Sequence, residues 1–291
     1  MLENLNTIKT EEKRCRYMRT AIKAMVDKYF NDYIAIKYKY EYKQKGIDVL
    51  TFALPTSRDI DKKDKETSTK ACLEYIIKTI GNGNDEKGKR FNDTRHRFVI
   101  NEINDTHRKY FADINSENFN VISKCRRVIG VPKLYEKTIW LVGPCIVAGL
   151  YVEDTDTLGT KLQRIINENG EKIRVVALPI PNTACRKYFF ETLDGLNPVS
   201  GDCVVWLDQT FRFIRWDYDC IEEYKQLVKE HGTNLYYDIP VHCGAEAMEM
   251  IAQKVFYAVS DNNDKKGMDI SKEYKMFIKG DLTALSDGDS T

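Results

Sequence analysis

The sequence predicts an α/β fold, a three-layer α/β/α arrangement with helices on both faces of a parallel sheet, preceded by a smaller α+β N-terminal region. Two observations support this prediction. After Lys137, short apolar segments alternate with amphipathic segments of helical length, and strands separated in this way pair in parallel through right-handed crossovers. Before Lys137, an apolar stripe with helical spacing is followed by residue-by-residue alternation, which is typical of a half-buried strand.

The net charge changes sign along the 291-residue chain. Residues 1–134 contain 28 Lys and Arg against 19 Asp and Glu, whereas residues 135–291 contain 17 against 25. This asymmetry favours two modules or a basic face that meets an acidic partner; alternatively, the halves neutralise each other across an interface. We therefore expect a basic N-terminal region (1–134), an α/β domain (135–260) and a polar C-terminal tail (261–291).

The composition argues against several classes of protein. Residues 1–20 lack the apolar core of a secretory signal, and no apolar run approaches the roughly 20 residues that span a bilayer. The eight cysteines form neither a CxxC pair nor a zinc-ligand spacing. We therefore expect a cytoplasmic protein with free thiols, no metal site and no cofactor.

The N-terminal region is expected to contain a helix, a β-hairpin and a second helix. The hairpin prediction rests on the alternation of Ile and Tyr with Lys and Glu from Ile34 to Tyr42, followed by a Lys45-Gly46 turn. Tyr and Lys can bind nucleic acid, but on a strand they would lie on opposite faces, so nucleic acid is not favoured here. The expected elements are the helices Glu11–Phe30 and Thr67–Ile80, the strands Ile34–Tyr42, Ile47–Leu54 and Arg97–Ile103, and a loop at Gly81–Asn92.

The second half alternates between strands and helices. Its apolar segments have strand length, and its longer segments carry apolar residues three and four positions apart. We expect the four strands to form one parallel sheet. The expected strands are Thr138–Val142, Ile173–Leu178, Cys203–Leu207 and Leu235–Tyr237, and the expected helices are Thr157–Asn169, Arg186–Leu193, Asp219–Glu230 and Ala245–Val259.

The candidate chemistry lies just beyond these strands, because an open parallel sheet places its working residues at the carboxyl ends of its strands. Cys145 follows the first strand, and Asp238 and His242 follow the fourth. A thiol beside an imidazole suits nucleophilic acyl chemistry, because His can take the thiol proton and stabilise the thiolate. Asp238 could then hold the imidazole in the required tautomer.

Each of these residues also has a purely structural interpretation. Cys145 could be a buried thiol at a strand end, since free Cys is among the most buried residue types. His242 could cap the helix that begins near Cys243-Gly244, and Asp238 could make turn hydrogen bonds.

The order of these segments resembles that of SGNH/GDSL hydrolases, an esterase and acyltransferase family with a three-layer, flavodoxin-like sheet. In that family an apolar strand ends in Gly-Asp-Ser, followed by a V-x-D-x-x-T turn and a helix that begins near a Leu-Gln pair. Here the corresponding segments are Ile139 to Cys145, Val152 to Thr157, and Leu162-Gln163. Gly201 to Trp206 resembles the strand of the family's third sequence block, and Tyr237 to Glu246 resembles its last block. The resemblance therefore covers roughly 120 residues.

The resemblance departs from the family pattern at the site itself. Cys145 stands in place of the nucleophilic Ser, Pro144 precedes it in place of Asp, and Asp238 lies four residues before His242 rather than three. Of the family's oxyanion donors only the Cys145 N–H carries over directly, so Asn182 or Gln209 would have to supply a substitute amide. Losing one such donor typically costs about 10²–10³ in rate, so a weak or altered activity is one expectation.

Three hypotheses follow, the first two from the resemblance and the third from the basic N-terminal region. The first is an acyl-transfer enzyme, an esterase or acyltransferase with a Cys nucleophile, which would act on a small-molecule or carbohydrate hydroxyl or use an acyl-thioester donor. The second is a non-catalytic scaffold or binding protein of the same fold, and the third is a nucleic-acid-binding N-terminal module with a vestigial second domain. The Gly-Pro-Cys variant is similar to SGNH-like proteins that low-GC Gram-positive bacteria encode near cell-surface polysaccharide genes.

Overall fold

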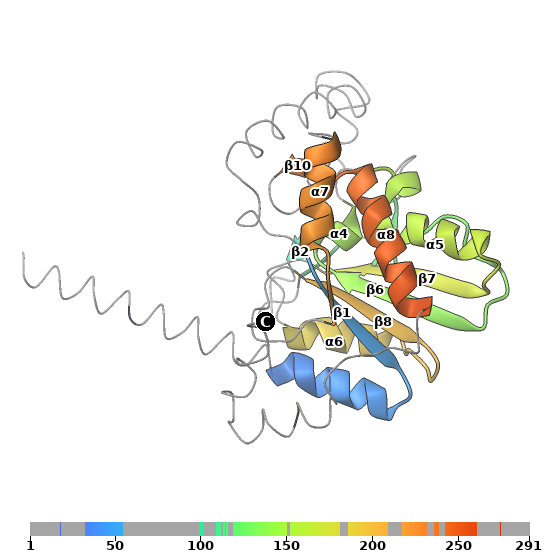
Figure 1. Ribbon diagram of the computed structural model, residues 1–291. Coiled ribbons are helices and arrows are strands. Elements are labelled where there is room, and N and C mark those ends of the chain that lie inside the picture. The colour runs from blue at the N-terminus through green and yellow to red at the C-terminus, as the bar shows by residue number, and fades with distance from the viewer. Residues whose placement is uncertain are drawn as a thin grey trace, which may run out of the picture.

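A seven-stranded mixed sheet in the order β4-β5-β7-β6-β8-β1-β9 organises the protein (Figure 1). The strands from β7 to β9 run parallel to one another, while β4 and β5 extend one edge in antiparallel pairing. This computed structural model describes residues 18, 33–54, 99–101, 109–111, 113, 115, 119–149, 152–180, 186–208, 217–231, 236–238, 242–260 and 274.

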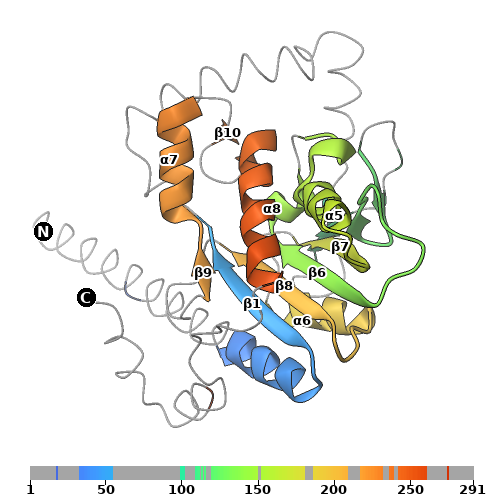
Figure 2. The same cartoon turned by 45° about the vertical axis from the view of Figure 1, so that its right-hand side comes forward.

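Helices cover both faces of this sheet, which confirms the α/β class and its three layers. α4, α5, α7 and α8 lie on one face, and α6 lies on the other beside the helix formed by residues 33–44 (Figures 1 and 2). The helices are α4 (Cys145–Ala148), α5 (Leu158–Glu168), α6 (Arg186–Gly195), α7 (Ile221–His231) and α8 (Ala245–Ser260), with a 3-10 turn at Asp154–Asp156.

Alternation along the strands supplies the two apolar layers. In β6, Ile139 and Leu141 face the α5 and α8 side, whereas Trp140 and Val142 face the α6 side. Strands buried on both faces are rich in apolar residues, as the central segments Ile139–Val142 and Val204–Leu207 are. The sheet strands are β1 (Asp48–Ala53), β4 (Val121–Ile122), β5 (Cys125–Arg126), β6 (Lys137–Gly143), β7 (Ile173–Pro179), β8 (Cys203–Asp208) and β9 (Tyr218–Asp219), and the separate pairs are β2 (Val99–Asn101) with β3 (Lys109–Phe111) and β10 (Tyr236–Asp238) with β11 (His242–Cys243).

The prediction of a strand over Ile34–Tyr42 is wrong, because residues 33–44 are helical. Ile34, Ala35 and Ile36 are buried in succession, whereas the predicted half-buried strand would bury only alternate residues. The predicted hairpin therefore does not form. The predicted strand Ile47–Leu54 is present as β1, but it pairs in parallel with β8.

The expected fourth parallel strand also differs from the structure. The segment around Leu235–Tyr237 contributes β10, which pairs antiparallel with β11 in a separate two-stranded ladder. β1 occupies the next position in the sheet instead, between β8 and β9. The sheet therefore includes a strand from the N-terminal region. The predicted helices Glu11–Phe30 and Thr67–Ile80 and the loop Gly81–Asn92 lie outside the described residues, apart from Met18.

Candidate active site

The first part of the site is the turn from β6 into α4. β6 ends at Gly143, and Pro144, which has no N–H to continue a ladder, starts the helix by accepting the N–H groups of Val147 and Ala148 at 2.9 and 3.3 Å. Gly143 is required by packing, because a Cβ at this position would lie 2.5 Å from the carbonyl oxygen of Leu207 on β8. The backbone of Cys145 thus follows directly from the end of a central parallel strand.

This turn lies at a topological switch point. From β6 the chain passes through α4 and α5 to β7 on one side, and from β7 it returns through α6 on the opposite face to β8 on the other side. Open α/β sheets bind ligands at the carboxyl ends of the two strands where the connections diverge. β7 and β8 end at this same edge, at Pro179 and Asp208. Asn182 and Gln209, the predicted oxyanion donors, follow these strands and lie outside the described residues.

The second part of the site is the β10–β11 ladder. His242 opens β11, and its backbone is the register partner of Asp238 on β10. β11 in turn lies against α4, with Cα atoms within 8 Å of one another. The backbone positions of Cys145, His242 and Asp238 therefore belong to elements that meet, although the chain between Cys145 and Asp238 passes through three sheet strands.

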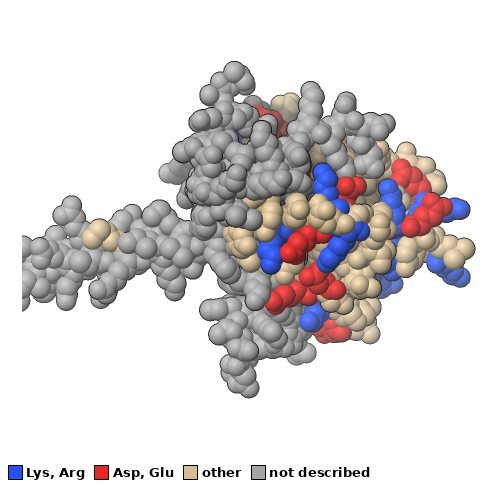
Figure 3. Space-filling model, turned by 90° about the horizontal axis from the view of Figure 1, so that it is seen from below, with Lys and Arg blue, Asp and Glu red and all other residues tan. Residues whose placement is uncertain are grey.

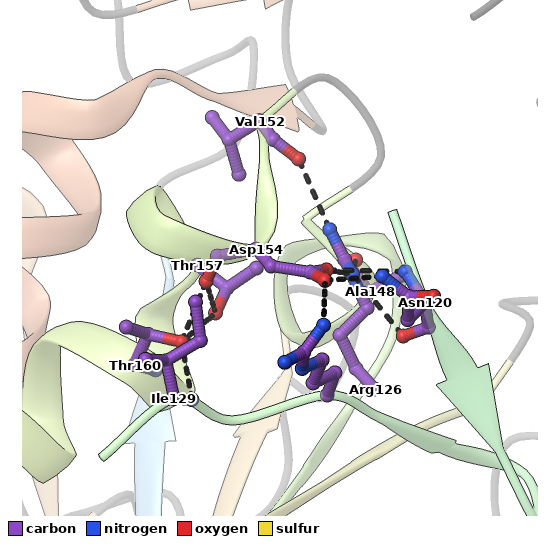
Figure 4. Close-up of polar contacts among 9 residues, drawn as sticks. Asn120, Arg126, Ile129, Ala148, Val152, Asp154, Thr157 and Thr160 are labelled. Carbon is purple, nitrogen blue, oxygen red and sulfur yellow. Dashed lines mark hydrogen bonds and ion pairs between the residues drawn. The ribbon is translucent and has the colours of Figure 1, made fainter. Parts of the chain in front are cut away.

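A buried charged network, which the sequence did not predict, lies beside α4 (Figure 4). Arg126 on β5 and Asp154 form an ion pair with both side chains almost fully buried. Asp154 also accepts hydrogen bonds from the backbone N–H and the side-chain amide of Asn120, at 3.1 and 2.6 Å. The guanidinium of Arg126 lies over the ring of Phe119, 3.6 Å from its centroid.

Burial lowers the pKa of Arg126 to about 9, so its guanidinium remains charged at neutral pH. A buried cation is tolerated only when its donors have acceptors, and the partners of Arg126 are all carbonyl or carboxylate oxygens. No pattern in the sequence indicated this role, because β4 and β5 contain two residues each and show no periodicity.

Two other residues of the family-like segments have structural roles. Thr157 caps α5 by accepting the N–H of Thr160, which fits its place at the end of the V-x-D-x-x-T turn. Gln163 is fully buried and binds the edge of β7, donating to the carbonyl of Ile173 and accepting from the N–H of Val175. These contacts fix α5 against the sheet and with it the direction of the chain that leaves α4.

No family model, curated protein or solved structure matches this chain. Within the described ranges, no group of three or more His, Cys, Asp and Glu side chains is placed to hold a metal ion. None of the helices in those ranges is long and apolar enough to cross a membrane.

Proposed function

We propose that the protein is an SGNH-like acyl-transfer enzyme, an esterase or acyltransferase, in which Cys145 is the nucleophile. The observation that carries this proposal is the meeting of α4, which begins at Cys145, with β11, which begins at His242. The strand-to-helix turn at the switch point supports the same assignment, because it is where open sheets bind their ligands.

The proposed chemistry has two half-reactions. His242 takes the proton of the Cys145 thiol, and the thiolate attacks the carbonyl carbon of an ester or thioester. The tetrahedral oxyanion collapses, the bond to the leaving oxygen or sulfur breaks, and His242 returns its proton to that leaving group. Water or an acceptor hydroxyl, deprotonated by His242, then attacks the thioester on Cys145 and releases the thiol.

Asp238 has an orienting role in this scheme. Its backbone is paired with that of His242, and a carboxylate beside an imidazole selects the tautomer whose other nitrogen can accept a proton. Asn182 and Gln209 are proposed as amide donors to the oxyanion, since each follows a parallel strand that ends at the same edge as β6. A carbohydrate hydroxyl as the acceptor rests on the family resemblance alone.

The test compares rates of thioester cleavage across pH in four proteins. We expect His242→Ala to slow acylation near pH 7 by about 10²–10⁴, the usual range for a positioned acid–base group. Asp238→Ala should slow it less, and Cys145→Ser should be much weaker than the parent because a hydroxyl is far less acidic than a thiol. Equal rates in the parent and His242→Ala would refute the role of His242.

The main alternative is a non-catalytic scaffold of the same fold. It predicts that Cys145 alkylates no faster than an ordinary thiol and that no thioester is cleaved at any pH. The nucleic-acid alternative predicts salt-dependent retention on RNA. In the described part of the N-terminal region, Lys39 is paired with Asp217, and Lys37 with Glu41, so these lysines already have anionic partners.

A further inference from the structure

α4 is too short to fix its own direction. It contains four residues, and the backbone hydrogen bonds that join it to its flanking residues are those that Val147 and Ala148 donate to Pro144 and that Gly149 donates to Ile146, at 2.9, 3.3 and 3.2 Å. The first turn of a helix is costly to form, and the last carbonyls of every helix need partners from outside. The orientation of α4 must therefore come from its surroundings.

Arg126 supplies a partner at the end of α4. Its Nε donates to the carbonyl oxygen of Ala148, the last residue of α4, at 2.8 Å, and its Nη2 donates to the carbonyl oxygen of Val152 at 3.1 Å. One planar side chain thus holds both sides of the connection between α4 and the 3-10 turn (Figure 4).

Arg126 is itself attached to the seven-stranded sheet. Arg126 belongs to β5, and its backbone pairs with Ala177 on β7. The remaining contacts of the guanidinium, the ion pair with Asp154 and a 3.2 Å hydrogen bond to the carbonyl of Asn120, fix its plane. Displacing the guanidinium would therefore free the end of α4 to move relative to β5 and β7.

We propose that Arg126 is a positioning residue for Cys145: it holds the C-terminal end of α4 and thereby orients the helix that Cys145 begins. Asp154 supports this role, because its carboxylate neutralises and aligns the guanidinium of Arg126. This inference rests on the proposed function for its catalytic consequence, but the anchoring of α4 is a property of the fold. Misplacing a reacting group by about 1 Å can cost about 10²-fold in rate, so the consequence is measurable.

The test uses Arg126→Lys in the full chain, because Lys keeps the charge beside Asp154 but cannot present a planar fork to the carbonyls of Ala148 and Val152. We expect amide hydrogen exchange at Val147 and Ala148 to speed up at least 10-fold, with exchange in β8 unchanged. We also expect acylation of Cys145 by a small thioester, corrected for the folded fraction, to slow by 10- to 100-fold at saturating probe.

Asp202→Asn is the matched control. Asp202 is a buried carboxylate at the opposite end of β6 and accepts hydrogen bonds from the Thr138 N–H at 2.8 Å and the Trp140 Nε1 at 2.9 Å. This variant should lower the melting temperature while leaving exchange in α4 and the corrected acylation rate near those of the parent. A third variant, Asp154→Asn, keeps the shape of the network and should give an effect between the parent and Arg126→Lys.

The outcomes separate the two claims. Faster exchange in α4 of Arg126→Lys, with no acylation of Cys145 even in the parent, would support the role of Arg126 in holding α4 and refute the proposed function. Unchanged exchange in α4 would overturn the positioning role, whatever the acylation rate. Equal slowing of acylation in Arg126→Lys and Asp202→Asn would reduce Arg126 to a general contributor to stability.

Discussion

Buried charges in this protein are held by several partners each, and this determines which single substitutions matter. Asp202 binds three donors from two segments, and Arg126 reaches four acceptor groups through its three nitrogens. Removing one member of such a set leaves the others buried without a partner, which costs more than the set contributes in the intact protein. A single substitution at one of these positions should therefore destabilise every segment that the buried side chain binds.

Gly143→Ala tests the close approach of β6 to β8. The added Cβ would contact the backbone oxygen of Leu207, which cannot move without disturbing the ladder, so we expect a loss of about 1–3 kcal/mol in unfolding free energy. Gly195→Ala in α6 is the control, because a Cβ there meets no atom within 4 Å. Denaturant unfolding of both variants measures the difference, and equal stabilities would contradict the geometry of this turn.

Cys125 provides a pH test within the same molecule. Burial, with a smaller contribution from Asp113, raises the pKa of its thiol from an ordinary value near 9 to about 11. Only the thiolate reacts, so at pH 8 Cys125 should alkylate about 100-fold more slowly than an ordinary thiol. Its rate should keep rising up to about pH 11. Peptide mapping after iodoacetamide treatment measures this, and a plateau near pH 9 would contradict it.

At the scale of elements, the second half could be predicted from periodicity because its segments have lengths that only one element fits. α5, α6 and α8 begin and end within two residues of the predicted bounds. The helix formed by residues 33–44 could not be predicted from periodicity, because a Tyr side chain is long enough to bury its ring from the flank of a helix. Tyr38 stacks on Phe190 at 4.3 Å between ring centroids, and Tyr40 stacks on Tyr274. The alternation of Tyr and Lys along the sequence therefore did not indicate a strand.

The rule that chemistry follows the ends of parallel strands selected Cys145, Asp238 and His242 as candidates. β6 fits this rule, whereas β10 does not belong to the seven-stranded sheet, so the rule does not account for Asp238 and His242, although β11 lies beside α4. It did not predict that β10 and β11 form their own ladder, because two short strands carry no signal of pairing direction. Arg126 was missed because its contacts join segments that are distant in sequence.

Asp217→Ala tests the attachment of the 33–44 helix to the sheet. Asp217 accepts hydrogen bonds from Lys39 at 2.8 Å and from both the N–H and the hydroxyl of Thr51 on β1 at 2.8 Å. Its loss leaves the Thr51 N–H without this acceptor, so we expect a loss of about 1–3 kcal/mol in unfolding free energy. Glu41→Ala removes a more exposed pair with Lys37 and should cost less than about 0.5 kcal/mol. A larger effect of Glu41→Ala would contradict this ranking.

At the scale of the whole molecule, the charge asymmetry is partly resolved within the fold. Lys39 with Asp217 and Arg126 with Asp154 each join a base from residues 1–134 to an acid from residues 135–291. On the described part of the face seen from below, basic and acidic side chains are interleaved (Figure 3). The two halves therefore neutralise each other at these contacts, as one of the sequence-based alternatives expected.

The position of β1 predicts that residues 135–260 do not fold alone. β1 lies between β8 and β9, and its Leu50 and Phe52 belong to the apolar core on the α8 side. Without it, one edge of β8 and part of this core are exposed. We expect the 135–260 fragment to unfold without a cooperative thermal transition. A 33–260 fragment, which includes β1, should show a cooperative transition. A cooperative transition in the shorter fragment would show that β1 is dispensable.

Intact-mass measurement after treatment with a small acyl thioester shows whether Cys145 is acylated. We expect the parent protein to gain one acyl group, mapped to the peptide that contains Cys145, and Cys145→Ala to gain none. The other seven cysteines remain in that variant, so they serve as an internal control. Undiminished label in Cys145→Ala, carried by another cysteine, would contradict the assignment and favour the scaffold alternative.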